Sequence, residues 1–134
     1  MSKDWVKDIF GMHHHYGVHS VVDNMDKEKL TKYLEFRANF LQEELDELKK
    51  ADNPEDVVDA LIDLCVVAIG TLDAFNVDAY KAWNDVLEAN MNKTVGVKES
   101  RPNPLGLPDL IKPAGWTAPT HFGNVGHLDK VFDV

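Results

Sequence analysis

Apolar residues recur at helical spacing in four stretches of the chain, and residues typical of helix caps and turns separate these stretches. The predicted helices cover residues 4–17, 26–51, 53–75 and 78–93. Gly17 would end the first of them, and Asp26 is the candidate N-cap of the second. Asn53-Pro54 is the strongest start signal, because asparagine caps a helix N-terminus and proline favours its first position. No alternating strand pattern and no glycine-rich phosphate loop is present. The sequence therefore predicts an all-α fold, built as a four-helix-type bundle.

The composition changes after residue 95, where glycine and proline become frequent. Such a segment cannot continue as regular helix. It nevertheless carries apolar side chains that a solvated tail would not need: Leu110, Ile111, Trp116 and Phe122. We therefore expect a helical domain at residues 1–95 and an irregular C-terminal tail at residues 96–134. The tail should pack on the bundle or on a neighbouring subunit.

Carboxylates interrupt the apolar faces of the second and third predicted helices. They are Glu43, Glu44, Glu47, Asp59 and Asp63. With about 100° of rotation per residue, Glu44 and Glu47 fall inside the apolar arc of the second helix. Asp63 interrupts the mostly apolar run of residues 57–69, and Asp59 lies one turn earlier on the same face. The short connection at residues 51–53 favours an antiparallel hairpin, which would turn the two acidic pairs toward each other.

Several carboxylates that face a core repel one another and lose hydration, so they require a cationic partner. Among basic residues only Arg37 shares the arc, and it cannot balance five acids. A di-iron site would need Glu-x-x-His motifs, and a Ca²⁺ loop would need the Asp-x-Asp-x-Asp-Gly type of pattern; neither occurs. Mg²⁺ prefers oxygen ligands and often binds substrate phosphates as well. The sequence therefore predicts a Mg²⁺ site, while Asp46 belongs to the solvated helix surface.

Composition excludes several classes of partner. A formal net charge of −9 disfavours binding to a nucleic-acid backbone, which would need clustered lysine and arginine. The single cysteine, Cys65, excludes a disulfide within the chain, as is typical of a reducing compartment. The longest apolar run, residues 64–69, is too short to span a bilayer. We therefore expect a cytoplasmic protein that uses neither nucleic acid nor membrane as a partner.

The fourth predicted helix adds polar groups suited to a nucleotide. Asn90 and Lys93 lie three residues apart and share a helix face. A lysine ammonium can bind phosphate oxygens, and an asparagine amide can bind a sugar hydroxyl or a base edge. Of the run His13-His14-His15, at most one or two side chains can face a common site, because consecutive residues point around a helix. Together with Mg²⁺, the Asn90 and Lys93 side chains indicate phosphoryl or nucleotidyl hydrolysis.

Taken together, these motifs resemble a known family. Glu43-Glu44-x-x-Glu47, an acidic pair on the next helix, and Asn90-Met91-x-Lys93 resemble the MazG-like all-α nucleoside triphosphate pyrophosphohydrolases. The resemblance is greatest to short phage and bacterial members, relatives of phosphoribosyl-ATP pyrophosphatase and the dimeric dUTPases. Met12-His13-x-x-Tyr16-Gly17 is similar to the His-x-x-Phe-Gly motif of that branch. Lys112-Pro113-x-Gly115-Trp116-x-x-Pro119 resembles the tail of many short members.

One departure from the family pattern concerns the third predicted helix. The wider family has Glu-x-x-Asp there, whereas Ala60 lies three residues before Asp63 in this chain. We assign the ligands to Asp59 and Asp63, with Asp56-x-x-Asp59 as the other possible register. The number and position of the metal ions depend on this choice.

The resemblance implies hydrolysis of a nucleoside or deoxynucleoside triphosphate to the monophosphate and pyrophosphate, with Mg²⁺ or Mn²⁺ as cofactor. The metal ligands would be Glu43, Glu44, Glu47, Asp59 and Asp63, and the three glutamates would also serve catalysis. The substrate-binding residues would be Asn90, Lys93, His13, Tyr16 and Arg37. Burial and distances decide which carboxylate is the general base. Two alternatives stay open: phosphoribosyl-ATP hydrolysis, and a non-catalytic helical interaction protein with acids only on its surface.

The resemblance further implies a homodimer or homotetramer with sites formed between subunits. The hydrophobic pattern supports an oligomer independently, because the third predicted helix is apolar around its circumference. A few short helices of one chain can cover only part of such a helix. We therefore expect an interface on the second and third helices.

Overall fold

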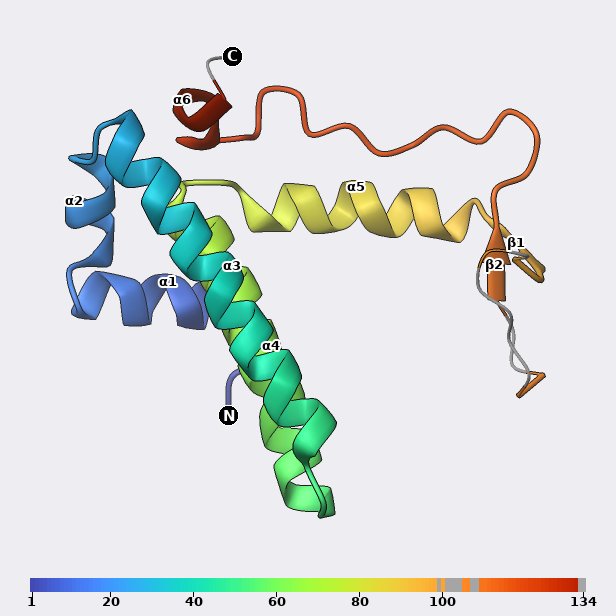
Figure 1. Ribbon diagram of the computed structural model, residues 1–134. Helices are drawn as coiled ribbons and strands as arrows, with labels where there is room; N and C mark the ends of the chain where they lie inside the picture. The colour runs from blue at the N-terminus through green and yellow to red at the C-terminus, as the bar shows by residue number, and fades with distance from the viewer. Residues whose placement is uncertain (99, 101–104, 107–108, 133–134) are drawn as a thin grey trace. The chain divides into compact units, whose positions relative to one another are not determined.

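The computed structural model describes residues 1–98, 100, 105–106 and 109–132, and its fold is all-α, as predicted (Figure 1). The contacts divide the chain into two compact units, which are residues 1–79 with 123–134, and residues 80–122. The division at residue 95 that the composition suggested stays a prediction. None of the helices in the described ranges is both long and apolar enough to cross a membrane.

The first unit is built on an antiparallel hairpin of α3 (Lys27–Lys50) and α4 (Pro54–Ala74), which run side by side in Figure 1. The Asp26 side chain caps α3 by accepting a hydrogen bond from the Lys29 backbone amide. The Asn53 side chain caps α4 in the same way, by accepting from the amide of Asp56. Both caps were predicted from the sequence, and the short connection between them makes the two helices antiparallel.

Three shorter helices pack on this hairpin. They are α1 (Trp5–His15), α2 (Val18–Asp23) and α6 (Leu128–Phe132). α1 contacts α4, and α6 contacts α3. Gly17 ends α1 as predicted, with a left-handed φ of 71°, but α2 begins directly after it and was not predicted. With six residues, α2 is too short for helical periodicity to be recognised in the sequence.

The buried core of this unit lies where α2, α3 and the end of α4 meet. Its members are Val22, Leu30, Ala74 and Phe75. Leu128 and Val131 of α6 pack against this cluster, so the prediction that the tail contains no regular helix is wrong at its C-terminal end. The tail is held there by backbone contacts, since the His127 amide donates to the Phe75 carbonyl at 2.8 Å. Gly126 precedes this bond, and a Cβ at Gly126 would overlap the Phe75 carbonyl oxygen.

The second unit contains most of α5 (Ala79–Met91) and a two-stranded antiparallel ladder of β1 (Thr94–Gly96) and β2 (Asp109–Ile111). The indole Nε1 of Trp116 donates a hydrogen bond of 2.7 Å to the carbonyl of Ala89 in α5. The prediction that the chain has no strands is wrong here. Strands of three residues are too short to show the alternation by which a strand is recognised in sequence.

Candidate metal centre on α3 and α4

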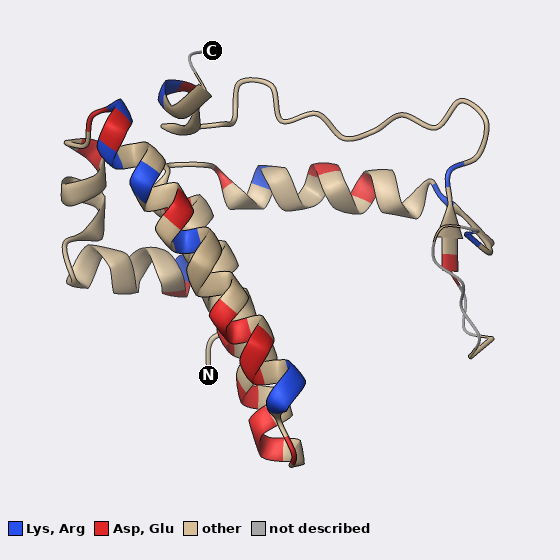
Figure 2. Cartoon of the chain, in the orientation of Figure 1, with Lys and Arg blue, Asp and Glu red and all other residues tan. Residues whose placement is uncertain are grey.

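The α3–α4 hairpin brings three of the five predicted carboxylates together. Glu44, Glu47 and Asp63 each offer an oxygen within 4.8 Å of the others. Figure 2 shows that acidic residues are concentrated along the half of α3 and α4 that lies nearer their connection. Glu44 is buried, with 9% of its surface exposed, Asp63 is partly buried, and Glu47 is exposed. The group therefore has a dry side and a side open to solvent.

Electrostatics make this carboxylate group unfavourable without a cation. The Oε2 atom of Glu44 is buried and has no hydrogen-bond partner. Burial, followed by the nearby charges of Glu47 and Asp63, raises the pKa of Glu44 above its usual value. Burial likewise raises the pKa of Asp63, with Asp59 and Glu47 as the next causes. In the described part of the chain, no lysine or arginine forms an ion pair with these three side chains.

The donor set fits a hard divalent cation. All the ligand atoms offered are carboxylate oxygens, which Mg²⁺ and Mn²⁺ prefer, whereas Zn²⁺ sites usually include nitrogen or sulfur. A cation would also supply the partner that the buried oxygen of Glu44 lacks. The arrangement can therefore hold a divalent ion while its exposed side admits a substrate.

Glu43 and Asp59 lie at the margin of this group. Both are exposed, and each raises the pKa of a neighbour, Glu43 that of Glu44 and Asp59 that of Asp63. Asp59 also lines a shallow groove with Pro54, Glu55, Val58 and Ile62. In the alternative register, Asp56 instead receives a hydrogen bond from the Asn53 side chain at the start of α4. The metal roles of Glu43 and Asp59 stay predictions.

Two substrate-binding candidates of the first unit make other contacts. The Arg37 guanidinium donates to the Thr71 hydroxyl and to the Val67 carbonyl, both at 2.9 Å, and thus bonds to α4. Tyr16 is 74% exposed, and its ring lies 4.7 Å from that of His15. The structure therefore gathers neither residue with the three carboxylates, and their substrate roles stay predictions.

A second cluster of polar side chains joins α1, α2 and α4. Within it, Asp73 Oδ2 accepts hydrogen bonds from His13 Nδ1 at 2.8 Å and from His19 Nε2 at 2.7 Å. Sequence motifs pointed to His13 but not to His19 or Asp73. A signal existed, because Asp73 is a further carboxylate in the apolar third predicted helix. His13 is buried whereas His14 and His15 are exposed, which agrees with the rule that consecutive histidines cannot share one site.

Asn90 and Lys93 belong to the second unit. Asn90 is exposed near the end of α5, and its carbonyl accepts the amide of Lys93 at 3.2 Å. The Lys93 ammonium lies over the ring of Trp116, 5.3 Å from its centroid. Binding of a substrate by these two residues stays a prediction.

A family model described as phosphoribosyl-ATP pyrophosphohydrolase matches residues 18–90, which is more than half of the chain. The chain belongs to the phosphoribosyl-ATP pyrophosphohydrolase family. This family is part of the MazG-like all-α nucleoside triphosphate pyrophosphohydrolase superfamily, so the resemblance inferred from sequence motifs is confirmed. Membership indicates pyrophosphohydrolase activity on a nucleotide. The matched range includes all three carboxylates of the group and ends before Lys93. Comparisons with curated proteins and with solved structures gave no match.

Proposed function

We propose that this chain hydrolyses a nucleoside or deoxynucleoside triphosphate to the monophosphate and pyrophosphate, with Mg²⁺ as cofactor and Mn²⁺ as a possible substitute. The observation that supports this most strongly is the group of Glu44, Glu47 and Asp63 with the buried, partnerless Oε2 of Glu44. When bound, a divalent cation neutralises polyphosphate charge and lowers the pKa of a bound water. Family membership supplies the reaction class.

The residues of this group would divide the work according to their exposure. Glu44 and Asp63, on the buried side, would hold the cation in place. Glu47 is exposed, so it can accept the proton of the attacking water and release it to solvent. The water oxygen would bond to the α-phosphorus, and the bond from that phosphorus to the bridging oxygen would break, so that pyrophosphate leaves. Lys93 would bind phosphate oxygens, and Asn90 the sugar or the base.

Phosphoribosyl-ATP is the second candidate substrate. It is named in the description of the matching family, and its hydrolysis between the α- and β-phosphates would use the same groups in the same roles. The two candidates differ in what the chain must recognise at the adenine end of the molecule. A substrate panel therefore has to include both.

The decisive experiment combines this panel with labelled water. Each nucleoside triphosphate, each deoxynucleoside triphosphate and phosphoribosyl-ATP would be incubated with Mg²⁺ in ¹⁸O water, and the products analysed by mass spectrometry. We expect pyrophosphate as the first product, with the label in the monophosphate. Orthophosphate as first product, label in pyrophosphate, or no hydrolysis of any substrate would refute the proposal.

A matched pair of variants tests the role of the carboxylate group. Glu44→Gln removes a buried ligand with little change of shape, and we expect activity to fall at least about 10- to 100-fold. Asp46→Asn changes an exposed carboxylate on the same helix and should leave activity unchanged. Equal activities of the two variants would show that the group is not the site of the reaction.

A further inference from the structure

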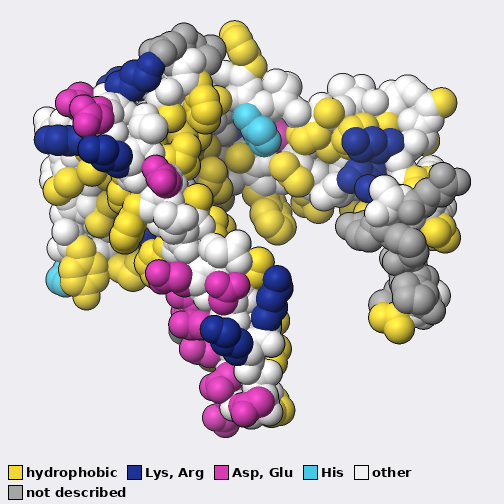
Figure 3. Space-filling model, in the orientation of Figure 1, with side chains coloured by type: hydrophobic (Ala, Val, Ile, Leu, Met, Phe, Trp, Pro, Cys, Tyr) yellow, Lys and Arg dark blue, Asp and Glu magenta, His cyan; other side chains and the backbone are white. Residues whose placement is uncertain are grey.

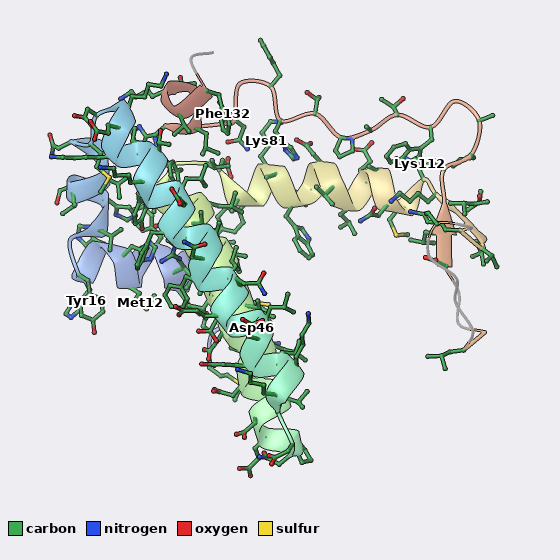
Figure 4. All side chains as sticks on the ribbon, in the orientation of Figure 1. Met12, Tyr16, Asp46, Lys81, Lys112 and Phe132 are labelled. Atoms are coloured by element: carbon green, nitrogen blue, oxygen red, sulfur yellow. The ribbon has the colours of Figure 1, made fainter. Side chains whose placement is uncertain are left out.

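Two lysines of the second unit are brought together at the end of the β-ladder. The antiparallel register pairs Thr94 with Ile111, and continuing it by one residue places Lys93 opposite Lys112. Their ammonium nitrogens lie 5.3 and 5.0 Å from the centroid of the same ring, that of Trp116. Lys112 is labelled in Figure 4, where it lies beside the C-terminal end of α5.

The indole that carries both ammonium groups is fixed to α5. Trp116 is partly buried, and its Nε1 donates to the carbonyl of Ala89 at 2.7 Å. Ala89 is itself buried and precedes Lys93 by about one helical turn. One ring, held in place by its hydrogen bond to α5, therefore orients both Lys93, which follows α5, and Lys112, which follows β2. Figure 3 shows basic side chains lying against hydrophobic ones in this unit.

Like charges placed directly opposite each other in a ladder repel, and a nearby carboxylate usually relieves the repulsion. Neither Lys93 nor Lys112 forms an ion pair with a carboxylate among the residues that the structure describes. The chain as a whole has 23 acidic and only 14 basic side chains, so an excess of lysines cannot explain the pairing. The faces of the indole attract both ammonium groups but carry no negative charge that would neutralise them.

We propose that Lys93, Lys112 and Trp116 form an anion site for a pyrophosphate group, either free or as the terminal part of a nucleotide triphosphate. Two ammonium groups complement a multiply charged phosphate chain, with oxygens enough for both. The identity of the anion rests on the proposed function. Lys112 is the new binding residue, and Trp116 is a positioning residue whose ring holds both ammonium groups. The tail thus contributes to substrate binding.

Calorimetric titration of the metal-free chain with inorganic pyrophosphate tests the site without any catalytic step. We expect Lys112→Gln to weaken pyrophosphate binding about 5- to 10-fold or more, a loss typical of one charge-assisted contact. Lys112→Arg should retain most of the affinity. Lys81→Gln is the matched control, because Lys81 lies on α5 and pairs with Asp85 at 2.9 Å. Trp116→Phe should weaken binding while leaving the far-ultraviolet circular dichroism of the chain unchanged.

The nucleotide arm of the test compares a triphosphate analogue that cannot be hydrolysed with the monophosphate. Lys112→Gln should weaken binding of the analogue and leave binding of the monophosphate unchanged. Equal affinity of the unaltered chain and Lys112→Gln for pyrophosphate, or no pyrophosphate binding at millimolar concentration, would overturn the inference. Pyrophosphate binding that depends on Lys112 in a chain without hydrolytic activity would instead refute the proposed function alone.

Discussion

At the scale of single residues, Glu44 is the most unusual side chain in the described part of the molecule. It is an acid in a buried position, with two other carboxylates close by and an oxygen that lacks any hydrogen-bond partner. Burial of a carboxylate without a partner is unfavourable, and a protein retains such a group when binding requires it. The pKa values of Glu44 and Asp63 are raised for this reason.

The raised pKa predicts how pH affects stability. In the metal-free chain the folded state holds the Glu44 proton more tightly than the unfolded state does. The free energy of unfolding therefore includes a contribution that is present below the ordinary pKa of 4.5 and is lost as the pH rises through the raised pKa. Glu44→Gln removes this dependence, so the variant should gain stability relative to the unaltered chain as pH rises. Urea unfolding of both proteins at several pH values measures the difference, and a difference independent of pH would contradict the prediction.

With metal bound, the unaltered chain should instead be more stable than the Glu44→Gln variant. A cation that binds only the folded state raises its stability by mass action, so millimolar Mg²⁺ or Mn²⁺ should raise the Tm of the unaltered chain. The shift should shrink in Glu44→Gln and persist in Asp46→Asn, and a chelator should abolish both the shift and hydrolysis. If neither ion changes the Tm of the unaltered chain, the carboxylate group does not bind a divalent cation.

At the scale of elements, the first unit depends on contacts that cross from helix to helix. Asp73 of α4 binds His13 of α1 and His19 of α2, and only 10% of its side chain is exposed. On the adjoining surface, Arg37 of α3 bonds to the backbone of α4 beside Gly70. A Cβ at Gly70 would lie 2.8 Å from the Arg37 guanidinium, so glycine permits this close approach. The Asp73 bonds hold α1 and α2 on the hairpin, and the Arg37 bonds join its two helices.

Removal of the Asp73 carboxylate should therefore loosen three helices at once. Asp73→Ala leaves two imidazoles without their acceptor, and we expect a loss of roughly 3–6 kcal/mol in the free energy of unfolding, because each of the two hydrogen bonds to a charged group contributes about 1.5–3 kcal/mol. Asp23→Ala is the control, since Asp23 bonds to His127 at 2.8 Å but its side chain is 58% exposed. It should cost at most about 1 kcal/mol. Urea midpoints give both values, and equal losses would mean that the Asp73 contacts add little.

At the scale of the whole molecule, one chain leaves apolar surface of the hairpin uncovered. Leu61 is 47% exposed, Val58 62% and Phe36 60%. Scattered apolar residues are common on protein surfaces, but Val58 and Leu61 lie one turn apart on a helix that is apolar on most sides. We propose that a second copy of the chain covers this surface in a homodimer or homotetramer, close to the carboxylate group.

Such an interface should be obligate, with no stable folded monomer at working concentration. Leu61→Asp places a charge on this surface and should reduce assembly and activity together. Leu61 suits this test better than Val66 or Ile69, which are partly buried within one chain, so their substitution would also disturb its own packing. Thr31→Asp, at an exposed position of α3, is the control. Sedimentation measures assembly, and a compact, active monomer of 15.1 kDa would contradict the proposal.

The sequence by itself determined the helical hairpin and its caps, because these follow from signals within a few residues: the 3.6-residue apolar period, Asp26 and Asn53. It also determined that acids would lie on the facing sides of the hairpin, since helical periodicity fixes the direction of each side chain. The family could be recognised from the sequence for the same reason, because its motifs are local patterns on those helices.

Only the tertiary structure decided which acids meet. Helical angle placed Asp59 and Asp63 on one face, but the separation of the two helix axes and the register of the hairpin brought Asp63 to Glu44 and Glu47 and left Asp59 exposed. The bonds of Asp73, more than fifty residues from its histidine partners, likewise depend on packing and on no local signal. Pairing of β1 with β2 brought Lys93 and Lys112 to one indole, although nineteen positions separate them in sequence. Distances between side chains on different elements are set by how the elements pack, and a single sequence does not contain that geometry in any local pattern.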